Sequence, residues 1–383
     1  MTSQIFTLDT ADLRARSSMK YRQYDADVLP LWVAEMDCAL APPIEQRLLE
    51  AVRIGDTGYR IVDGRLEQAL AEYAAQHWRW QIDPEQVRVV GDVGVGMIEL
   101  MRAHVDPGDR VVISSPIYPP FRSWTALAGG EVVDVPLRCE DDGWHFDLDG
   151  LRAAFAAGAR VYLLCNPANP VGRAWRSEEL GALADLAAEY DVLVIADEIH
   201  GPLPLEGASF TPFLTVSDAA REVGVSVLAA SKAWNLAGLK CAQVVSADGR
   251  SRERAGRIPP QSSSSAGHLG MLASERAWAA GGQWLEQAVR ELSANRDLLG
   301  ELVATHLPQA GYVPAEATYL GWLDLSAYDW GADPAGKILT EARVALNPGP
   351  SFGATGAGFA RINFACSPAV LTEAVERIGA LAR

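Results

Sequence analysis

The middle of the chain alternates short, continuously apolar segments with helical patterns, and this alternation constrains the fold more than any other feature. Four segments are rich in Val, Ile and Leu: residues 110–114, 161–164, 192–196 and 225–229. Strands that are covered on both faces have continuous apolar sequences of this kind. Between the second and third segments, Ser177 is placed to cap a helix whose leucines recur at helical spacing. The pattern predicts an α/β fold with a mostly parallel sheet and crossover helices.

The length of the chain and its C-terminal third indicate a second, smaller unit. At 383 residues the chain is long for one hydrophobic core, so we expect two subdomains. From about residue 283 to 307, apolar residues recur at helical spacing over a stretch long enough to link two domains. We therefore expect a large domain of residues 46–283 and a smaller α+β domain. The smaller domain would combine an N-terminal arm, residues 1–45, with residues 284–383.

The charge balance and the cysteines narrow the classes of function. Lys and Arg total 33 against 49 Asp and Glu, and the resulting net charge of −16 disfavours a nucleic-acid or anionic-membrane surface. The five cysteines are scattered and form no Cys-x-x-Cys pair, which predicts reduced thiols and no metal site. The N-terminus shows no signal-peptide pattern, and no apolar stretch approaches the ~20 residues of a membrane helix. We expect a cytoplasmic protein that binds neither nucleic acid nor membrane.

Polar residues follow three of the four predicted strands, at the points where those strands end. Residues 166–170 (NPANP) follow the second strand, residues 197–200 (DEIH) follow the third, and Ser231 and Lys232 follow the fourth. The carboxyl ends of parallel strands meet at one edge of a sheet, where open α/β folds bind their ligands. The sequence therefore predicts one site that draws on all three groups.

Lys232 and Asp197 indicate what that site binds. A lysine shortly after a buried strand is partly desolvated, which favours the neutral amine that forms a Schiff base. An aspartate at the end of a neighbouring strand can keep the pyridine nitrogen of pyridoxal 5′-phosphate (PLP) protonated, so that the ring acts as an electron sink. Taken singly, a solvated surface lysine and a helix-capping carboxylate are the simpler interpretations of these positions.

Three further side chains suit such a cofactor, and each has a structural alternative. Asn169, between two prolines, can donate to the phenolic oxygen of the ring or serve as an ordinary turn residue. His200 can lie near the same oxygen or pack at the rim of the site. Tyr118 can stack on the ring or belong to the core.

Two more features suit a phosphorylated cofactor and an amino-acid substrate. The glycine-rich segment at residues 91–97 can present backbone N–H groups to a phosphate at a helix N-terminus. Asp92 is compatible with a phosphate there only if its carboxylate caps the helix and points away. Arg361 lies in an apolar, strand-like run, where it can bind a substrate carboxylate through both nitrogens or form an internal salt bridge.

Together, these motifs resemble those of fold-type I PLP enzymes, the aspartate aminotransferase superfamily. The resemblance is greatest to the cystathionine β-lyase (MalY/PatB-type C–S lyase) branch, and it runs from about residue 8 to the C-terminus. The stretches that carry it are Leu29–Asp37 (LPLWVAEMD), Cys165–Arg173 (CNPANPVGR), Ala196–His200 (ADEIH), Ser231–Lys240 (SKAWNLAGLK) and Phe359–Cys366 (FARINFAC).

The resemblance implies a role for each matching residue. Lys232 would be the Schiff-base lysine and general base, Asp197 the partner of the pyridine nitrogen, and Tyr118 the residue stacked on the ring. Asn169 would bind the ring oxygen and Arg361 the substrate α-carboxylate. The implied phosphate cradle and substrate pocket are formed by Lys240, Ser231, the backbone at Val93 and Gly94, a tyrosine from the neighbouring subunit of a homodimer (Tyr59), and the pocket residues Val33 and Ala34.

The function that the resemblance implies is a PLP-dependent β-lyase. Such an enzyme would cleave L-cystathionine or another S-substituted cysteine to a thiol, pyruvate and ammonia. The alternatives are a class I/II aminotransferase that uses the same cofactor site and a regulator that binds PLP without turnover. The chain departs from the family pattern at Asp92-Val93, where a Pro-Gly pair is typical, and at Cys38, where an aromatic residue is typical. The departures lie around the cofactor entrance.

Overall fold

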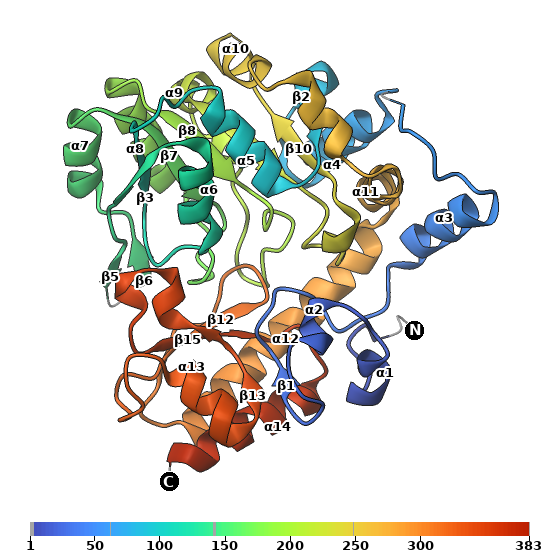
Figure 1. Ribbon diagram of the computed structural model, residues 1–383, viewed down its shortest axis with the longest axis vertical. Coiled ribbons are helices and arrows are strands. Elements are labelled where there is room, and N and C mark those ends of the chain that lie inside the picture. Colours follow the sequence, from blue (N-terminus) through green and yellow to red (C-terminus); the bar gives the residue numbers. More distant parts are fainter. Residues whose placement is uncertain (1–3, 62, 141–142, 248, 383) are drawn as a thin grey trace.

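The structure, a computed structural model, describes residues 4–61, 63–140, 143–247 and 249–382. Its main sheet has seven strands and occupies the upper half of Figure 1. In this sheet β10 runs opposite to the other six described strands, so the sheet is mostly parallel, as predicted. The strand order is β2 (Val87–Val90), β10 (Ala242–Val245), β9 (Gly224–Leu228), β8 (Leu193–Asp197), β7 (Ala159–Cys165), β3 (Arg110–Ile113) and β4 (Glu131–Asp134).

Both faces of this sheet are buried, which explains the continuous apolar sequences. In β7, Val161 and Leu163 belong to one hydrophobic cluster, whereas Tyr162 and Leu164 belong to another on the opposite face. Side chains that alternate along a strand point to opposite faces, so a strand between two clusters must be apolar throughout. The first cluster includes residues of α5 (Val93–Arg102) and α6 (Pro120–Ala128); the second includes residues of α7 (Leu148–Ala156) and α8 (Ser177–Glu189).

The four predicted central strands are present as β3, β7, β8 and β9, with ends that shift by at most two residues. The cap assigned to Ser177 is wrong by one position. Arg176 is the N-cap of α8, and Ser177 is the first helical residue. The carboxylate of Glu179 accepts a hydrogen bond from the Arg176 backbone nitrogen at 2.9 Å. An acidic side chain, and not the serine hydroxyl, therefore accepts from a backbone amide at the start of this helix.

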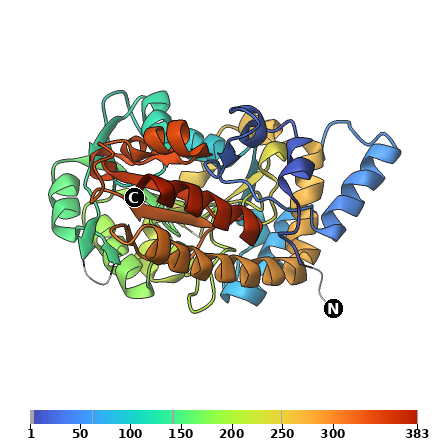
Figure 2. The same cartoon turned by 90° about the horizontal axis from the view of Figure 1, so that it is seen from below.

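A second sheet lies in the lower half of Figure 1, in the order β11 (Gly311–Tyr312), β12 (Leu320–Asp324), β15 (Phe359–Asn363) and β14 (Asn347–Pro348). The predicted long helix is α12 (Gly282–His306), which packs against α14 (Pro368–Gly379) along the underside of the molecule (Figure 2). The N-terminal segment joins this half, because β1 (Leu29–Pro30) pairs in parallel with β13 (Val344–Ala345).

Helix α3 (Pro42–Arg53) projects from the body of the molecule at the right of Figure 1. It connects the N-terminal segment, with α1 (Thr10–Arg14) and α2 (Met19–Arg22), to α4 (Arg65–Trp78), which packs against α11 (His268–Ala280). The antiparallel pair β5 (Arg138–Glu140) and β6 (Gly143–His145) lies apart from both large sheets. Within the described ranges, no helix is long and apolar enough to cross a membrane.

Candidate active site

A cavity of about 490 Å³ opens at the carboxyl ends of the parallel strands, between the two sheets. The predicted site residues converge on it from both halves of the molecule. Tyr59 does not line the cavity and is fully exposed on the loop after α3. The predicted residues that do line it are Val33, Ala34, Val93, Gly94, Tyr118, Asn169, Asp197, His200, Ser231, Lys232, Lys240 and Arg361.

Lys232 follows β9 and lies partly buried in the cavity wall. Its amine donates a hydrogen bond of 2.9 Å to the carbonyl oxygen of Ala34. Burial lowers the pKa of this amine from 10.5 to about 8, and the charge of Arg361 acts in the same direction. The neutral form of the amine, which a nucleophile or a base requires, is therefore easier to reach than for an ordinary lysine.

Asp197 ends β8, and His200 lies three residues further on; both are buried. Asp197 Oδ1 accepts a hydrogen bond from the Ile199 backbone nitrogen at 3.1 Å. Burial raises the pKa of this carboxyl to about 7, and the nearby Lys232 partly offsets the effect. The pKa of His200 falls well below its usual value because the ring is buried, and its Nδ1 has no hydrogen-bond partner among the described residues. The Asp197 carboxyl and the His200 ring can therefore each form a further hydrogen bond with a group bound in the cavity.

Arg361 comes from β15 of the second sheet and is almost fully buried. Its Nη1 donates to Asn169 Oδ1 at 2.9 Å, and its Nη2 donates to the Trp32 carbonyl at 3.0 Å. Both acceptors are neutral, so the internal salt bridge considered for this residue is not what the structure shows. Its Nε is buried without a partner among the described residues, and burial lowers the guanidinium pKa to about 10. A buried cation with neutral partners is suited to binding an anion.

The glycine-rich segment forms the start of α5, as the sequence predicts. Asp92 caps this helix, with its Oδ1 accepting from the Val95 backbone nitrogen at 2.8 Å. The first amides of a helix have no intrahelical acceptor, so Val93 and Gly94 present theirs at the cavity wall. A Cβ at position 94 would lie 2.9 Å from the Trp124 ring, and glycine is therefore required for the close packing here. Asp92 Oδ2 accepts from Lys240 Nζ at 2.7 Å.

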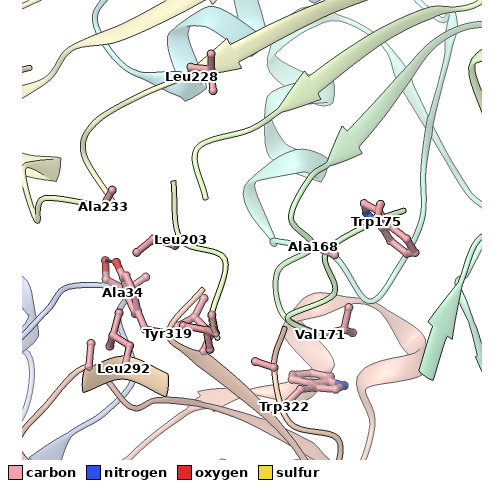
Figure 3. Packing of buried hydrophobic residues seen from close by; sticks show 14 of the residues in the cluster. Ala34, Ala168, Val171, Trp175, Leu203, Leu228, Ala233, Leu292, Tyr319 and Trp322 are labelled. Carbon is pink, nitrogen blue, oxygen red and sulfur yellow. Dashed lines mark hydrogen bonds between the residues drawn. The ribbon is translucent and has the colours of Figure 1, made fainter. Parts of the chain in front are cut away.

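Sequence reasoning did not identify the side chains that hold residues 32–36, the segment carrying Val33 and Ala34. The Tyr319 hydroxyl donates to the Ala34 carbonyl at 3.0 Å, and Figure 3 shows the two residues side by side. The amide of Asn363 donates to the carbonyls of Val33 and Glu35, each at 2.7 Å. Tyr319 lies outside the stretches that resemble the family, whereas Asn363 lies within Phe359–Cys366. Only the packed structure reveals the contacts of these two residues.

The comparisons with known proteins agree with this geometry. The sequence matches the profile of the aminotransferase class I and II family over residues 30–378. The chain belongs to this family. It is 42% identical to a protein of Mycobacterium tuberculosis that is assigned as a cystathionine β-lyase, over 95% of this chain and 94% of that protein. It is 33% identical to the cystathionine β-lyase of Corynebacterium glutamicum, over 97% and 98% of the two chains.

The structure of a Corynebacterium diphtheriae chain assigned as a PLP-dependent β-cystathionase superposes with a TM-score of 0.93 at 37% identity. The match covers 99% of this chain and 98% of the other. The aminotransferase-family member described here therefore has the fold-type I architecture, and the predicted α/β fold class is confirmed.

The residues of this family member fit PLP on structural grounds. The cavity offers an amine of lowered pKa, a buried carboxyl with one protein donor, and a helix N-terminus with a lysine beside it. These groups match the aldehyde, the pyridine nitrogen and the phosphate of the cofactor. Within the described part of the chain, no group of three or more His, Cys, Asp or Glu side chains is placed to hold a metal ion.

Proposed function

We propose that this protein is a PLP-dependent carbon–sulfur β-lyase. It acts on L-cystathionine or another S-substituted L-cysteine and releases a thiol, pyruvate and ammonia. Full-length relatives that carry the cystathionine β-lyase name support the proposal. The site roles assigned to Lys232, Asp197, Asn169 and Arg361 are part of it.

The observation that carries the proposal is the small number of cations around the cavity. Among the described residues that line it, only Lys232, Lys240 and Arg361 are cationic at neutral pH. The first two suit the cofactor and the third suits the substrate α-carboxylate, so none remains to clamp a distal carboxylate. Apolar side chains, including Met19, Trp32 and Trp124, line the cavity instead. This lining favours a thioether substrate over the dicarboxylic substrates of many aminotransferases.

The residues of the chain divide the reaction between them. Arg361 binds the α-carboxylate and, with Asn169 fixed against it, orients the Cα–H bond. The bound PLP supplies an electron sink for the charge that develops at Cα. Lys232 removes the Cα proton at Nζ, and the Ala34 carbonyl then accepts a hydrogen bond from the resulting ammonium group. Asp197 is buried, and the low dielectric around it strengthens its interaction with a cationic partner.

A homodimer with shared active sites is part of the proposal. Apolar side chains are exposed along α3 and the loop after it, where Val52 is 59% exposed and Ile54 is 78% exposed. An apolar surface of this kind is typical of an interface with another chain. Tyr59 lies on the same loop. If a second copy docks on α3, the Tyr59 hydroxyl of one copy would reach the phosphate cradle of the other.

The domain boundaries also remain proposals: a large domain of residues 46–283, and a smaller domain of residues 1–45 and 284–383. A cytoplasmic location is a further proposal. The five free cysteines suit such a location.

The deciding experiment is incubation of the PLP-loaded protein with L-cystathionine, with pyruvate measured by a coupled dehydrogenase. We expect pyruvate and ammonia without any added keto acid, and no pyruvate from the Lys232→Ala variant. Turnover that strictly requires a keto-acid acceptor would make the protein an aminotransferase. Stable PLP binding without turnover of any S-substituted cysteine would favour the regulator.

A further inference from the structure

The carboxylate of Asp92 makes the two kinds of contact that a phosphate makes in a cradle of this type. Oδ1 accepts a hydrogen bond from a backbone amide in the first turn of α5. Oδ2 accepts from Lys240 Nζ, a residue 148 positions away in the sequence. Helix N-termini and lysine ammonium groups are the common phosphate ligands in proteins. Asp92 and Lys240 both line the cofactor cavity.

We propose that Asp92 is an internal competitor for the cofactor phosphate at Lys240, and that it weakens PLP binding mainly by placing a negative charge beside the phosphate. The inference rests on the proposed phosphate cradle and not on the elimination reaction. It assigns a role to the residue at which the sequence departs from the family pattern.

The position of Lys240 supports this assignment. Lys240 has a φ of 59°, which is uncommon for a residue other than glycine, and of the described non-glycine residues with a positive φ it is the one that lines the cavity. Its backbone is fixed, because its carbonyl accepts a hydrogen bond from the Gly267 nitrogen at 2.9 Å. The other two cations of the cavity donate to different groups, Lys232 to Ala34 and Arg361 to Asn169 and Trp32. Lys240 is therefore the cation that Asp92 and the phosphate would share.

The exposure of the pair decides the direction of the effect. The side chains of Lys240 and Asp92 are 59% and 36% exposed, and exposed ion pairs add little stability. Breaking the Lys240–Asp92 ion pair, as phosphate binding to Lys240 would do, therefore costs little free energy. A carboxylate held near a phosphate dianion repels it at short range, where salt screens poorly. Removal of the charge at position 92 should tighten phosphate binding by about tenfold.

The test is a set of dissociation constants for the full-length protein freed of cofactor. Asp92→Asn keeps an oxygen that caps α5 and removes the charge. We expect this variant to bind PLP about tenfold more tightly than the wild type. It should bind pyridoxal, which lacks the phosphate, with unchanged affinity. The inhibition constant of inorganic phosphate as a competitor of PLP should fall by a similar factor in the variant.

Two control variants separate the possible outcomes. Asp147→Asn removes another helix-capping carboxylate, at α7 and outside the cavity lining, and should change none of these constants. Lys240→Met should weaken PLP and leave pyridoxal unchanged; if it does not, the phosphate cradle itself is wrong. Unchanged or weaker PLP binding by Asp92→Asn, with the Lys240→Met result as expected, would overturn the role of Asp92 alone. If Asp92→Asn unfolds, Asp92→Ser retains a capping oxygen and gives the same comparison.

Discussion

The guanidinium of Arg361 donates a hydrogen bond of 2.9 Å to the side-chain oxygen of Asn169, although 192 positions separate them in the sequence. The contact joins the second sheet to the edge of the seven-stranded sheet. Because the Asn169 oxygen accepts from Arg361, its amide nitrogen remains as the donor for another group. The proposed cofactor and substrate roles of the two residues are therefore coupled through one bond.

This coupling predicts different kinetic effects at the two positions. Arg361→Ala should raise KM by about 100-fold or more, because the substrate carboxylate loses its charged partner. Arg361→Lys should recover only part of the loss, since an ammonium group cannot form the paired contacts. Asn169→Ala should raise KM by about tenfold, because Arg361 loses one of its two fixed partners. Steady-state pyruvate formation from L-cystathionine measures all three, and an Arg361→Ala variant with normal KM would contradict the assignment.

Tyr319 is predicted to position Lys232 through the Ala34 carbonyl, to which both residues donate. Tyr319→Phe should lower kcat by about three- to tenfold and change KM little, because one fixed hydrogen bond is lost away from the substrate. The rate of Cα-proton exchange of L-alanine in deuterated water should fall by a similar factor. Normal exchange with reduced pyruvate formation would show that Tyr319 acts at another step. Tyr328→Phe, a buried tyrosine outside the cavity, is a matched control.

The Lys232 amine is predicted to be the residue that PLP modifies. Borohydride treatment of the PLP-loaded protein should fix the cofactor on Lys232, as mass spectrometry of a proteolytic digest can show. Lys232→Ala should lose both the adduct and turnover. An adduct on Lys240 would contradict the assignment.

The lowered pKa of Lys232 also predicts a pH-dependent stability for the cofactor-free protein. The folded-state pKa of about 8 lies below the ordinary value of 10.5, so the unfolded chain binds more protons between these two values. The free energy of unfolding should therefore rise with pH across this window, relative to Lys232→Met, by about 3 kcal/mol. Below pH 8 the difference between the two proteins should be constant. Urea unfolding at a series of pH values measures the free energy of unfolding of both proteins. If the two free energies change with pH in parallel across the whole window, the amine has an ordinary pKa.

The exposed apolar side chains of α3 predict the dimer interface. Val52→Glu should yield a monomer in sedimentation velocity, because the charge would be buried without a partner. Val313→Glu, at a position 52% exposed elsewhere on the surface, should leave the assembly intact. Tyr59→Phe should keep the dimer but loosen PLP by about tenfold, since one hydrogen bond to a charged acceptor is lost. A fully active wild-type monomer would contradict the shared site.

Much of the site follows from local sequence, because the topology of a parallel sheet brings strand ends together. Asp197 and Lys232 each follow an apolar segment, and the order β9, β8, β7 places those ends side by side. Helix caps are less certain from sequence, since several neighbouring polar residues can accept from the free amides at the start of a helix. The error at Ser177 arose in this way, with Glu179 taking the role of the cap.

The sequence by itself determined the fold class, the family and the chemistry of the residues at the strand ends, since these depend on local patterns of polarity and on short motifs. Only the tertiary structure decided which groups those residues contact. Tyr319 and Asn363 hold the segment that faces Lys232, and Asp92 pairs with Lys240 across 148 positions. Such contacts depend on how the two sheets pack against each other, and side-chain packing between distant segments leaves no periodic signal in the sequence.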